Sequence, residues 1–232
     1  MPCEITLYHC PEDEATIARL SKNANAQQER NSGFSANVQP WKGVCKNEYH
    51  YVARDKASGI ICGWLTIILK THKRTKYIYI LEISTRRIRN SLYGGVGQRL
   101  HNKMLEDAVH FGAKFVYLYP LNAIVRDLYM KPQWGYVELR PDVKHLFKPL
   151  VRDLVIPNDF LDTLAEEDII DIAKKIAGRD KTLIKRIETL APLIRGSPEI
   201  MQQLQDEIDI MEGNELSDSE KRKELRSFLA GI

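Results

Sequence analysis

The chain has 232 residues, of which 44% are hydrophobic and 28% charged, a composition typical of a soluble globular protein and not of a disordered one. Its length allows one large domain, or one ordinary domain with an appendage. The net charge of +3 hides an asymmetry: residues 1–150 carry 22 Lys and Arg against 13 Asp and Glu, whereas residues 151–232 carry 12 against 18. Residues 1–150, here called the basic front, suit an anionic ligand. The acidic residues 151–232 suit a cationic partner or the basic front itself.

The cysteines and the apolar runs indicate the compartment. The four cysteines form no CxxC pair and no short Cys/His cluster, which predicts free thiols in a reducing compartment and no metal site; they are Cys3, Cys10, Cys45 and Cys62. The first four residues lack the basic-then-apolar layout of a signal peptide. The longest apolar run, Ile60–Leu69, is about half of what spans a bilayer. We therefore expect an intracellular, cytoplasmic protein without membrane contact.

Strand and helix patterns alternate through the first 150 residues. The expected strands are residues 3–9, 49–54, 60–69, 76–85, 114–119, 135–139 and 145–150. The expected helices are a region that begins near Glu12 and fades in a loop over residues 23–35, a long helix over 98–111 and a short one over 122–130. This order predicts an α+β or mixed α/β layer fold.

From about Val155 the strand-type residues end, and residues typical of helix starts and ends follow. The expected helices are residues 159–177, residues 180–190 ended by Pro192, a third from Ser197 to Gly213, and a last one capped by Ser217. We therefore expect two domains, residues 1–152 and a small all-helical C-terminal appendage over residues 153–232. The acidic appendage is expected to pack on the basic front, to form a homodimer or to bind a protein partner.

A glycine-rich turn, Leu92-Tyr93-Gly94-Gly95-Val96-Gly97, joins the strand 76–85 to the helix 98–111. Three glycines in four positions leave consecutive backbone N–H groups unobstructed beside a helix N-terminus, where an anion binds. The turn predicts a site for a phosphate-containing ligand, and a plain tight turn explains the glycines equally well. The arginines that crowd it, as phosphate contacts or as an ordinary solvated face, are Arg86, Arg87, Arg89 and Arg99.

Further residues extend this turn into an ordered set. Trp64 follows Gly63 in the third strand, and Asn122, Leu128-Tyr129 and Trp134-Gly135-Tyr136 follow downstream. With these, residues 1–150 resemble the GCN5-related N-acetyltransferases (the GNAT superfamily). The family's phosphate loop reads Gln/Arg-x-x-Gly-x-Gly/Ala; Gly95-Val96-Gly97 fit its last three positions, but Leu92 stands at the Gln/Arg position.

The resemblance implies a mostly antiparallel central sheet, flanked by helices and splayed between its fourth and fifth strands. Acetyl-CoA, the implied cosubstrate, enters this gap, with its pantetheine on the fourth strand and its pyrophosphate on the loop before the main helix. No metal is implied. The residues assigned to acetyl-CoA are Ile83, Ser84, Tyr93, Gly94, Gly95, Val96, Gly97, Gln98 and Asn122. Asn122 has an equal alternative, the termination of a strand.

Glu82 and Tyr129 are the candidate catalytic residues. The period of two places Glu82 on the face of Ile78 and Ile80, and a carboxylate on an apolar face tends toward a raised pKa, which suits a general base. The alternative is a strand-end Glu paired with an arginine. The family motif places Tyr129 near the CoA sulfur, where a phenol of pKa about 10 keeps a proton for the leaving thiolate; the alternative is a structural tyrosine.

The expected activity is therefore acetyl-CoA-dependent transfer of an acetyl group to a primary amine, by direct attack in a ternary complex. The acceptor, whether a small molecule, a polyamine or a protein, has no signature in the sequence. The alternative, motivated by Leu92, is a catalytically degenerate acyl-CoA-binding scaffold whose C-terminal helices mediate protein–protein interaction. Nucleic-acid binding through the basic residues 70–99 is the weakest hypothesis. His101 and His110 are expected on the polar flank of the helix 98–111.

Overall fold

The computed structural model describes residues 3–31, 47–85, 95–214 and 216–232, with the side chains of residues 26–31 left out. It divides into two compact units, Met1–Glu138 with His145–Val155, and Leu139–Lys144 with Ile156–Ile232. In the first unit the strands are β1 (Cys3–His9), β2 (Glu48–Asp55), β3 (Ile61–His72), β4 (Thr75–Thr85), β5 (Ala113–Leu118) and β6 (Leu146–Pro149). Its helices are α1 (Glu14–Asn31), α2 (Val96–Phe111) and α3 (Ala123–Met130).

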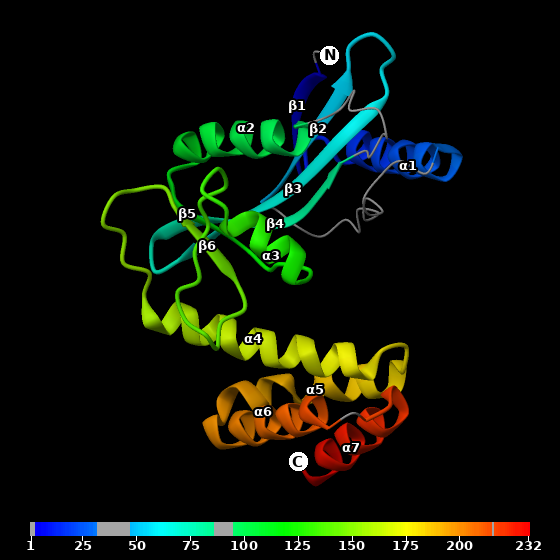
Figure 1. Cartoon of the computed structure of the whole chain (residues 1–232), viewed down its shortest axis with the longest axis vertical. Coiled ribbons are helices and arrows are strands. Elements are labelled where there is room, and N and C mark those ends of the chain that lie inside the picture. Colours follow the sequence, from blue (N-terminus) through cyan, green and yellow to red (C-terminus); the bar gives the residue numbers. More distant parts are fainter. Residues whose placement is uncertain (1–2, 32–46, 86–94, 215) are drawn as a thin grey trace. The chain divides into compact units, whose positions relative to one another are not determined.

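The six strands form one open sheet in the order of the sequence, β1-β2-β3-β4-β5-β6. Every neighbouring pair is antiparallel except β4 and β5, which run parallel and are connected through α2 (Figure 1). A parallel pair needs such a crossover because the chain must return to the end of the sheet at which the first strand began. The expected mixed α/β, mostly antiparallel sheet flanked by helices is confirmed.

The parallel pair β4–β5 is short. Its register runs from Lys76 opposite Ala113 to Ile80 opposite Leu118, whereas β4 continues to Thr85. The two strands therefore part after Ile80 and Leu118, as the expected splay between the fourth and fifth strands requires.

The two faces of the sheet carry different helices (Figure 1). On one face α2 packs on β2 to β5 and buries Leu100 and Met104 completely. On the other face α1 buries Ile17 against Trp64 and other residues of a separate core. At the α2 contact, a Cβ on Gly63 of β3 would lie 2.5 Å from Cγ1 of Val96, so the close approach of helix and sheet needs a glycine there.

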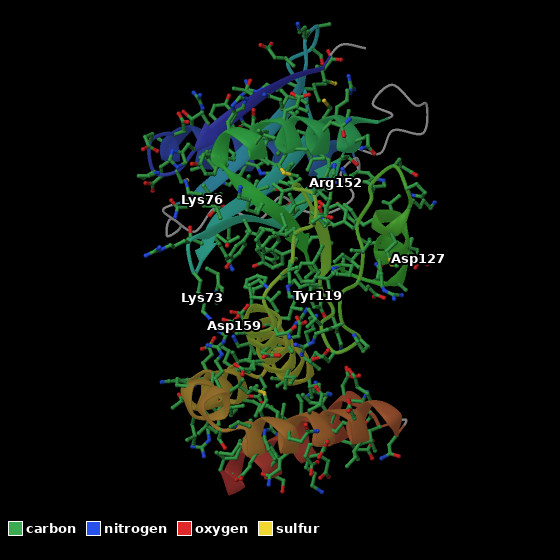
Figure 2. All side chains as sticks on the ribbon, turned by 90° about the vertical axis from the view of Figure 1, so that its left-hand side faces the viewer. Lys73, Lys76, Tyr119, Asp127, Arg152 and Asp159 are labelled. Carbon is green, nitrogen blue, oxygen red and sulfur yellow. The ribbon has the colours of Figure 1, made fainter. Side chains whose placement is uncertain are left out.

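A two-residue turn joins β3 and β4. Its central residues, Lys73 and Arg74, both have positive φ, 43° and 70°. This geometry matches the right-handed twist of the flanking strands, as in type I′ hairpin turns. Figure 2 shows Lys73 at this turn and Lys76 near the start of β4. The turn is tighter than the polar stretch from Lys70 to Lys76 suggested, because β3 extends to His72.

Three expected elements differ from the structure. The expected strand 135–139 is reduced to a single bridge between Val137 and Phe147, and the side chains of Val137 and Leu139 are exposed. The helix α1 continues to Asn31, through much of the expected loop 23–35.

The third difference is the helix α5 (Lys181–Gly196), which continues through Pro192 instead of ending there. The buried positions on either side of the proline, Ala191 and Ile194, continue one apolar stripe. Packing of this stripe offsets the backbone hydrogen bond that the proline ring removes.

The second unit contains α5 with α4 (Asn158–Ala177), α6 (Pro198–Gly213) and α7 (Asp218–Gly231), which share a core of their own. Its helices begin where the sequence predicted. The side chains of Asp180 and Ser197 accept hydrogen bonds from the first turns of α5 and α6, and Ser217 with Glu220 forms a capping box at α7. No helix among the described residues is both long and apolar enough to cross a membrane.

Candidate active site

The site is assembled around the N-terminus of α2, beside the free end of β4. Gly95 precedes the helix in the left-handed conformation, with φ 75°, and as a glycine it has no side chain that could cap the helix. The first helical hydrogen bond runs from the N–H of Arg99 to the carbonyl of Gly95, so the N–H groups of Val96, Gly97 and Gln98 lie before the helical ladder. The first turn carries no acidic residue. These three amides are oriented as an anion site requires.

Gly97 allows β4 and α2 to approach each other. A Cβ at this position would lie 3.2 Å from Cγ2 of Thr85, the last residue of β4. The side chain of Gln98 turns along the helix and donates to Asn102 at 3.0 Å. The remaining parts of the expected loop, including Leu92, Tyr93, Gly94 and three of the four arginines, lie outside the described residues.

Ile83 and Ser84 lie on the part of β4 that β5 has left. Both pair with β3, opposite Leu65 and Trp64. Ile83 packs against the core under α2, whereas Ser84 is fully buried on the opposite face. Because the β4–β5 register ends at Ile80, the β5-side edge of this segment is where an extended ligand would add to the sheet.

The expectation that Glu82 shares a strand face with Ile78 and Ile80 was wrong. Opposite β3, the register jumps from Ile80 to Glu82, so Leu81 is the extra residue of a β-bulge and is 45% exposed. A bulge shifts the alternation by one residue, and Glu82 therefore points to the face that α2 does not cover. There its Oε1 accepts a hydrogen bond of 2.8 Å from Oγ of Ser84.

This face holds a row of buried polar side chains that the sequence did not reveal. Thr66 lies directly opposite Glu82 and is 2% exposed. Its Oγ1 accepts from Nε1 of Trp64 at 3.0 Å and lies 3.2 Å from Nδ1 of His50. Nε2 of His50 lies 3.2 Å from Oε1 of Glu48, without the alignment of a hydrogen bond. The row thus runs across β2, β3 and β4 and ends at Glu82.

Tyr129 lies on the α2 side of the sheet, near the C-terminal end of α3. It is 4% exposed, and its ring meets those of Trp134 and Tyr136 edge to face at 4.9 and 5.3 Å. Burial raises the pKa of its hydroxyl above the usual 10. The side chain is therefore a fixed and protonated phenol.

His101 also belongs to this cluster, and its expected place on the polar flank of α2 was wrong. Its ring is 1% exposed and edge to face with Trp134, and its Nε2 lies 2.9 Å from the Tyr136 hydroxyl. Burial, with a smaller contribution from Lys148, lowers the pKa of His101 to about 4. His110, on the same helix, is exposed as expected.

Asn122 is the N-cap of α3. Its side-chain oxygen accepts from the N–H of Val125 at 3.0 Å, which fixes the start of the helix that carries Tyr129. Helix capping is the role that the structure shows for Asn122, and its contact with acetyl-CoA stays a prediction. Figure 2 shows Asp127 of the same helix.

The candidate catalytic residues lie on opposite faces of the sheet. Tyr129 belongs to the core under α2, and Glu82 lies on the other face. Beyond Ile80 and Leu118, no β4–β5 backbone pairing separates the two faces. Within the described residues, no group of three or more His, Cys, Asp or Glu side chains could hold a metal ion.

The strand order, the single parallel pair and the parting of its strands decide the fold. The first unit has the GNAT fold. No family model matches the chain, and no curated protein matches it in sequence. Solved structures similar to it include a GCN5-related glucosamine N-acetyltransferase region of a fungal multi-domain β-N-acetylglucosaminidase, at 18% identity and a TM-score of 0.39. That match covers 59% of this chain and only 17% of the fungal one.

Two other GNAT-type structures are matched over almost their whole length. An aminoglycoside acetyltransferase from an uncultured soil metagenomic sample is 16% identical, with a TM-score of 0.43 over 68% of this chain and 99% of its own. A chain of the NatC complex bound to Gag peptide and CoA is 14% identical, with a TM-score of 0.44 over 64% of this chain and 99% of its own.

Proposed function

We propose that the chain is an acetyl-CoA-dependent N-acetyltransferase that transfers the acetyl group to a primary amine by direct attack in a ternary complex. One observation carries this proposal. The strands β4 and β5 part after Ile80 and Leu118, and the N-terminus of α2 lies beside Thr85 at the free end of β4. An extended strand edge beside a helix N-terminus suits a ligand that has a peptide-like arm and a pyrophosphate.

The residues present fit acetyl-CoA. Backbone amides of Val96, Gly97 and Gln98 would hold its pyrophosphate, together with the turn that precedes them, and the helix dipole adds about 0.3–1 kcal/mol of attraction. Leu92 removes no backbone donor, so its departure from the family pattern leaves these amides unchanged. Ile83 and Ser84 would pair with the pantetheine arm. Bound acetyl-CoA would supply an acetyl thioester for the amine to attack.

Glu82 is the proposed general base. Its carboxylate is held by the hydroxyl of Ser84 and faces away from α2, on the face where an acceptor could approach separately from acetyl-CoA. An ionised carboxylate at this position is the form that takes a proton from an ammonium group. The neutral amine that results is the nucleophile.

Tyr129 is the proposed general acid. Burial keeps its hydroxyl protonated through the neutral range, and the rings of Trp134 and Tyr136 fix its orientation. The base and the acid act from opposite faces of the sheet, so the amine and the leaving sulfur would be served by separate groups. In this scheme Glu82 takes one proton from the ammonium group before the attack. As the C–S bond breaks, the hydroxyl hydrogen of Tyr129 passes to the sulfur. The second proton that the nitrogen loses when the amide forms passes through solvent to the Tyr129 oxygen.

The proposal is tested by acetyl transfer itself. Purified full-length chain is mixed with acetyl-CoA and a panel of a polyamine, an aminoglycoside and a peptide with a free N-terminus, and the release of CoA thiol is followed. We expect release above the no-acceptor background with at least one of these amines, and less release with Glu82→Gln. If acetyl-CoA binds and no amine on the panel increases thiol release, the proposed transfer to these acceptors is contradicted.

A further inference from the structure

Two thiols meet on the α2 side of the sheet, and neither belongs to the candidate catalytic residues. Cys3 belongs to the edge strand β1 and Cys62 to β3, with β2 between them (Figure 1). Their sulfur atoms lie 3.1 Å apart. Ala53 of β2 lies beside them, since Sγ of Cys62 is also 3.3 Å from its carbonyl oxygen. The small side chain of Ala53 leaves the space over β2 in which the two thiols meet.

We propose that Cys3 and Cys62 form a reversible dithiol–disulfide pair, a modification site that reacts with a peroxide. Its formation does not depend on acetyl transfer. The sulfurs must approach by about 1 Å to reach the bond length of about 2.05 Å. Because β2 lies between the two strands, the Cα atoms must also come within about 7 Å of each other, so the backbone at Cys62 has to move.

The fold allows this approach at Cys62. In the β2–β3 register, Ala53 lies opposite Gly63 and Arg54 opposite Ile61, so Cys62 is the extra residue of a bulge. A bulged residue has no ladder partner of its own, and the strand is already bent there. A shift of Cys62 therefore leaves the pairing of its neighbours in place.

The two thiols have different surroundings. Cys3 is partly exposed, and Nη2 of Arg99 lies 3.7 Å from its sulfur. The thiolate is the reactive form of a cysteine, and the guanidinium is placed to donate a hydrogen bond to it. Cys62 is fully buried, and burial and the neighbouring Cys3 raise the pKa of its thiol. Because of these surroundings, Cys3 reacts first with the peroxide, and Cys62 then resolves the sulfenic acid that forms on Cys3.

The chemistry needs one peroxide for each pair. The thiolate of Cys3 attacks a peroxide oxygen, the O–O bond breaks, and the leaving oxygen departs as water or an alcohol after taking a proton from solvent, leaving a sulfenic acid on Cys3. The sulfur of Cys62 then attacks the sulfenic sulfur, and the sulfenic hydroxyl leaves as water with the thiol proton of Cys62. The two thiols lose two electrons, which reduce the peroxide.

The test uses the reduced full-length chain and one equivalent of hydrogen peroxide, followed by blocking of the remaining thiols and peptide mapping without reductant. We expect one linked peptide that joins Cys3 to Cys62, the loss of two thiols per chain, and full reversal by a dithiol reductant. Because this measurement needs no variant, a folding defect cannot obscure it. Oxidation that leaves Cys3 and Cys62 unlinked, or that links either one to another cysteine as the main product, overturns the proposal.

Variants separate the two roles. Cys62→Ser should leave a Cys3 sulfenic acid that dimedone traps, and Arg99→Gln should slow the formation of the linked peptide, with recovery in Arg99→Lys. The matched control is Cys10→Ser, which changes a fully buried cysteine in the core on the α1 side and should leave the rate unchanged. An Arg99→Gln chain that forms the link at the wild-type rate contradicts the role of the guanidinium.

Discussion

At the scale of single residues, Tyr129 and Glu82 differ in how far the sequence predicted their surroundings. The motif around Tyr129 indicated a tyrosine on a short helix, and the structure adds the rings that hold it. Glu82 was assigned to the wrong face because strand alternation was counted through Leu81. The bulge there depends on the partner strand, and no pattern within β4 alone marks it.

The first prediction concerns Tyr129. Replacing it with Phe removes the hydroxyl and preserves the ring packing on Trp134 and Tyr136. We expect kcat to fall by roughly 10- to 10³-fold, the range of a lost acid–base group, with little change in melting temperature. Steady-state kinetics with the amine that supports the fastest thiol release measures the effect. An unchanged kcat removes Tyr129 from the mechanism.

The second prediction concerns His101, whose pKa is lowered from 6.5 to about 4 in the folded chain. Between these two values the unfolded chain binds a proton at this residue and the folded chain does not, so the free energy of unfolding falls as the pH falls. Over the whole range from pH 6.5 to about 4, the loss in free energy of unfolding is about 3 kcal/mol. We expect His101→Gln to lose this part of the pH dependence.

Urea unfolding of the chain at several pH values from 4 to 6.5 measures the slope. His110→Gln is the matched control, since it changes an exposed histidine on the same helix and should keep the wild-type slope. Equal slopes for wild type and His101→Gln would show that His101 titrates alike in both states, against the prediction.

At the scale of elements, most strands and helices were predictable because their apolar residues repeat at periods of two and of three to four. The N-caps of α5, α6 and α7 were visible as Asp180, Ser197 and Ser217. The expected strand 135–139 was not formed, because pairing depends on a partner edge, which the sequence alone does not reveal. His101 was misplaced for a related reason: its partner, Tyr136, lies 35 residues further along the chain.

The third prediction concerns the packing of α2 on β3. Gly63→Ala places a methyl group 2.5 Å from Cγ1 of Val96 and 2.8 Å from Cδ1 of Leu100. Both distances are shorter than an ordinary van der Waals contact. Overpacking of this kind destabilises a core by about 1–3 kcal/mol. Denaturant unfolding should show this loss. Gly196→Ala, with no atom within 4 Å of the added Cβ, is the control and should not destabilise the chain. A Gly63→Ala chain as stable as wild type contradicts the close packing of α2 on β3.

At the scale of the whole molecule, the charge asymmetry and the change of pattern near Val155 predicted a basic α/β part and an acidic helical part. The structure divides near this position, but it also assigns Leu139–Lys144 to the helical unit. Two contacts account for this assignment: Arg140 pairs with Asp162 of α4, and the N–H of Lys144 donates to the buried Asp168 at 3.0 Å. Such contacts depend on the tertiary fold, and the sequence showed only a connecting segment.

The fourth prediction follows from the separate cores of the two units. We propose that residues 1–152 and 153–232 are two domains, and calorimetry should therefore resolve two unfolding transitions. Leu204→Ala removes a fully buried side chain from the core of the helical unit. It should lower the free energy of unfolding of that unit by about 2–5 kcal/mol and shift its transition to lower temperature. The other transition should stay in place. A single transition that shifts as a whole contradicts two independent domains.

The account as a whole depends on acetyl-CoA binding where β4 leaves β5 and α2 begins. The most direct measurement is a calorimetric titration of the full-length chain with CoA. We predict saturable binding of one CoA per chain with micromolar affinity or better. Absence of binding at millimolar CoA would contradict the proposed enzyme, whatever acceptor is offered.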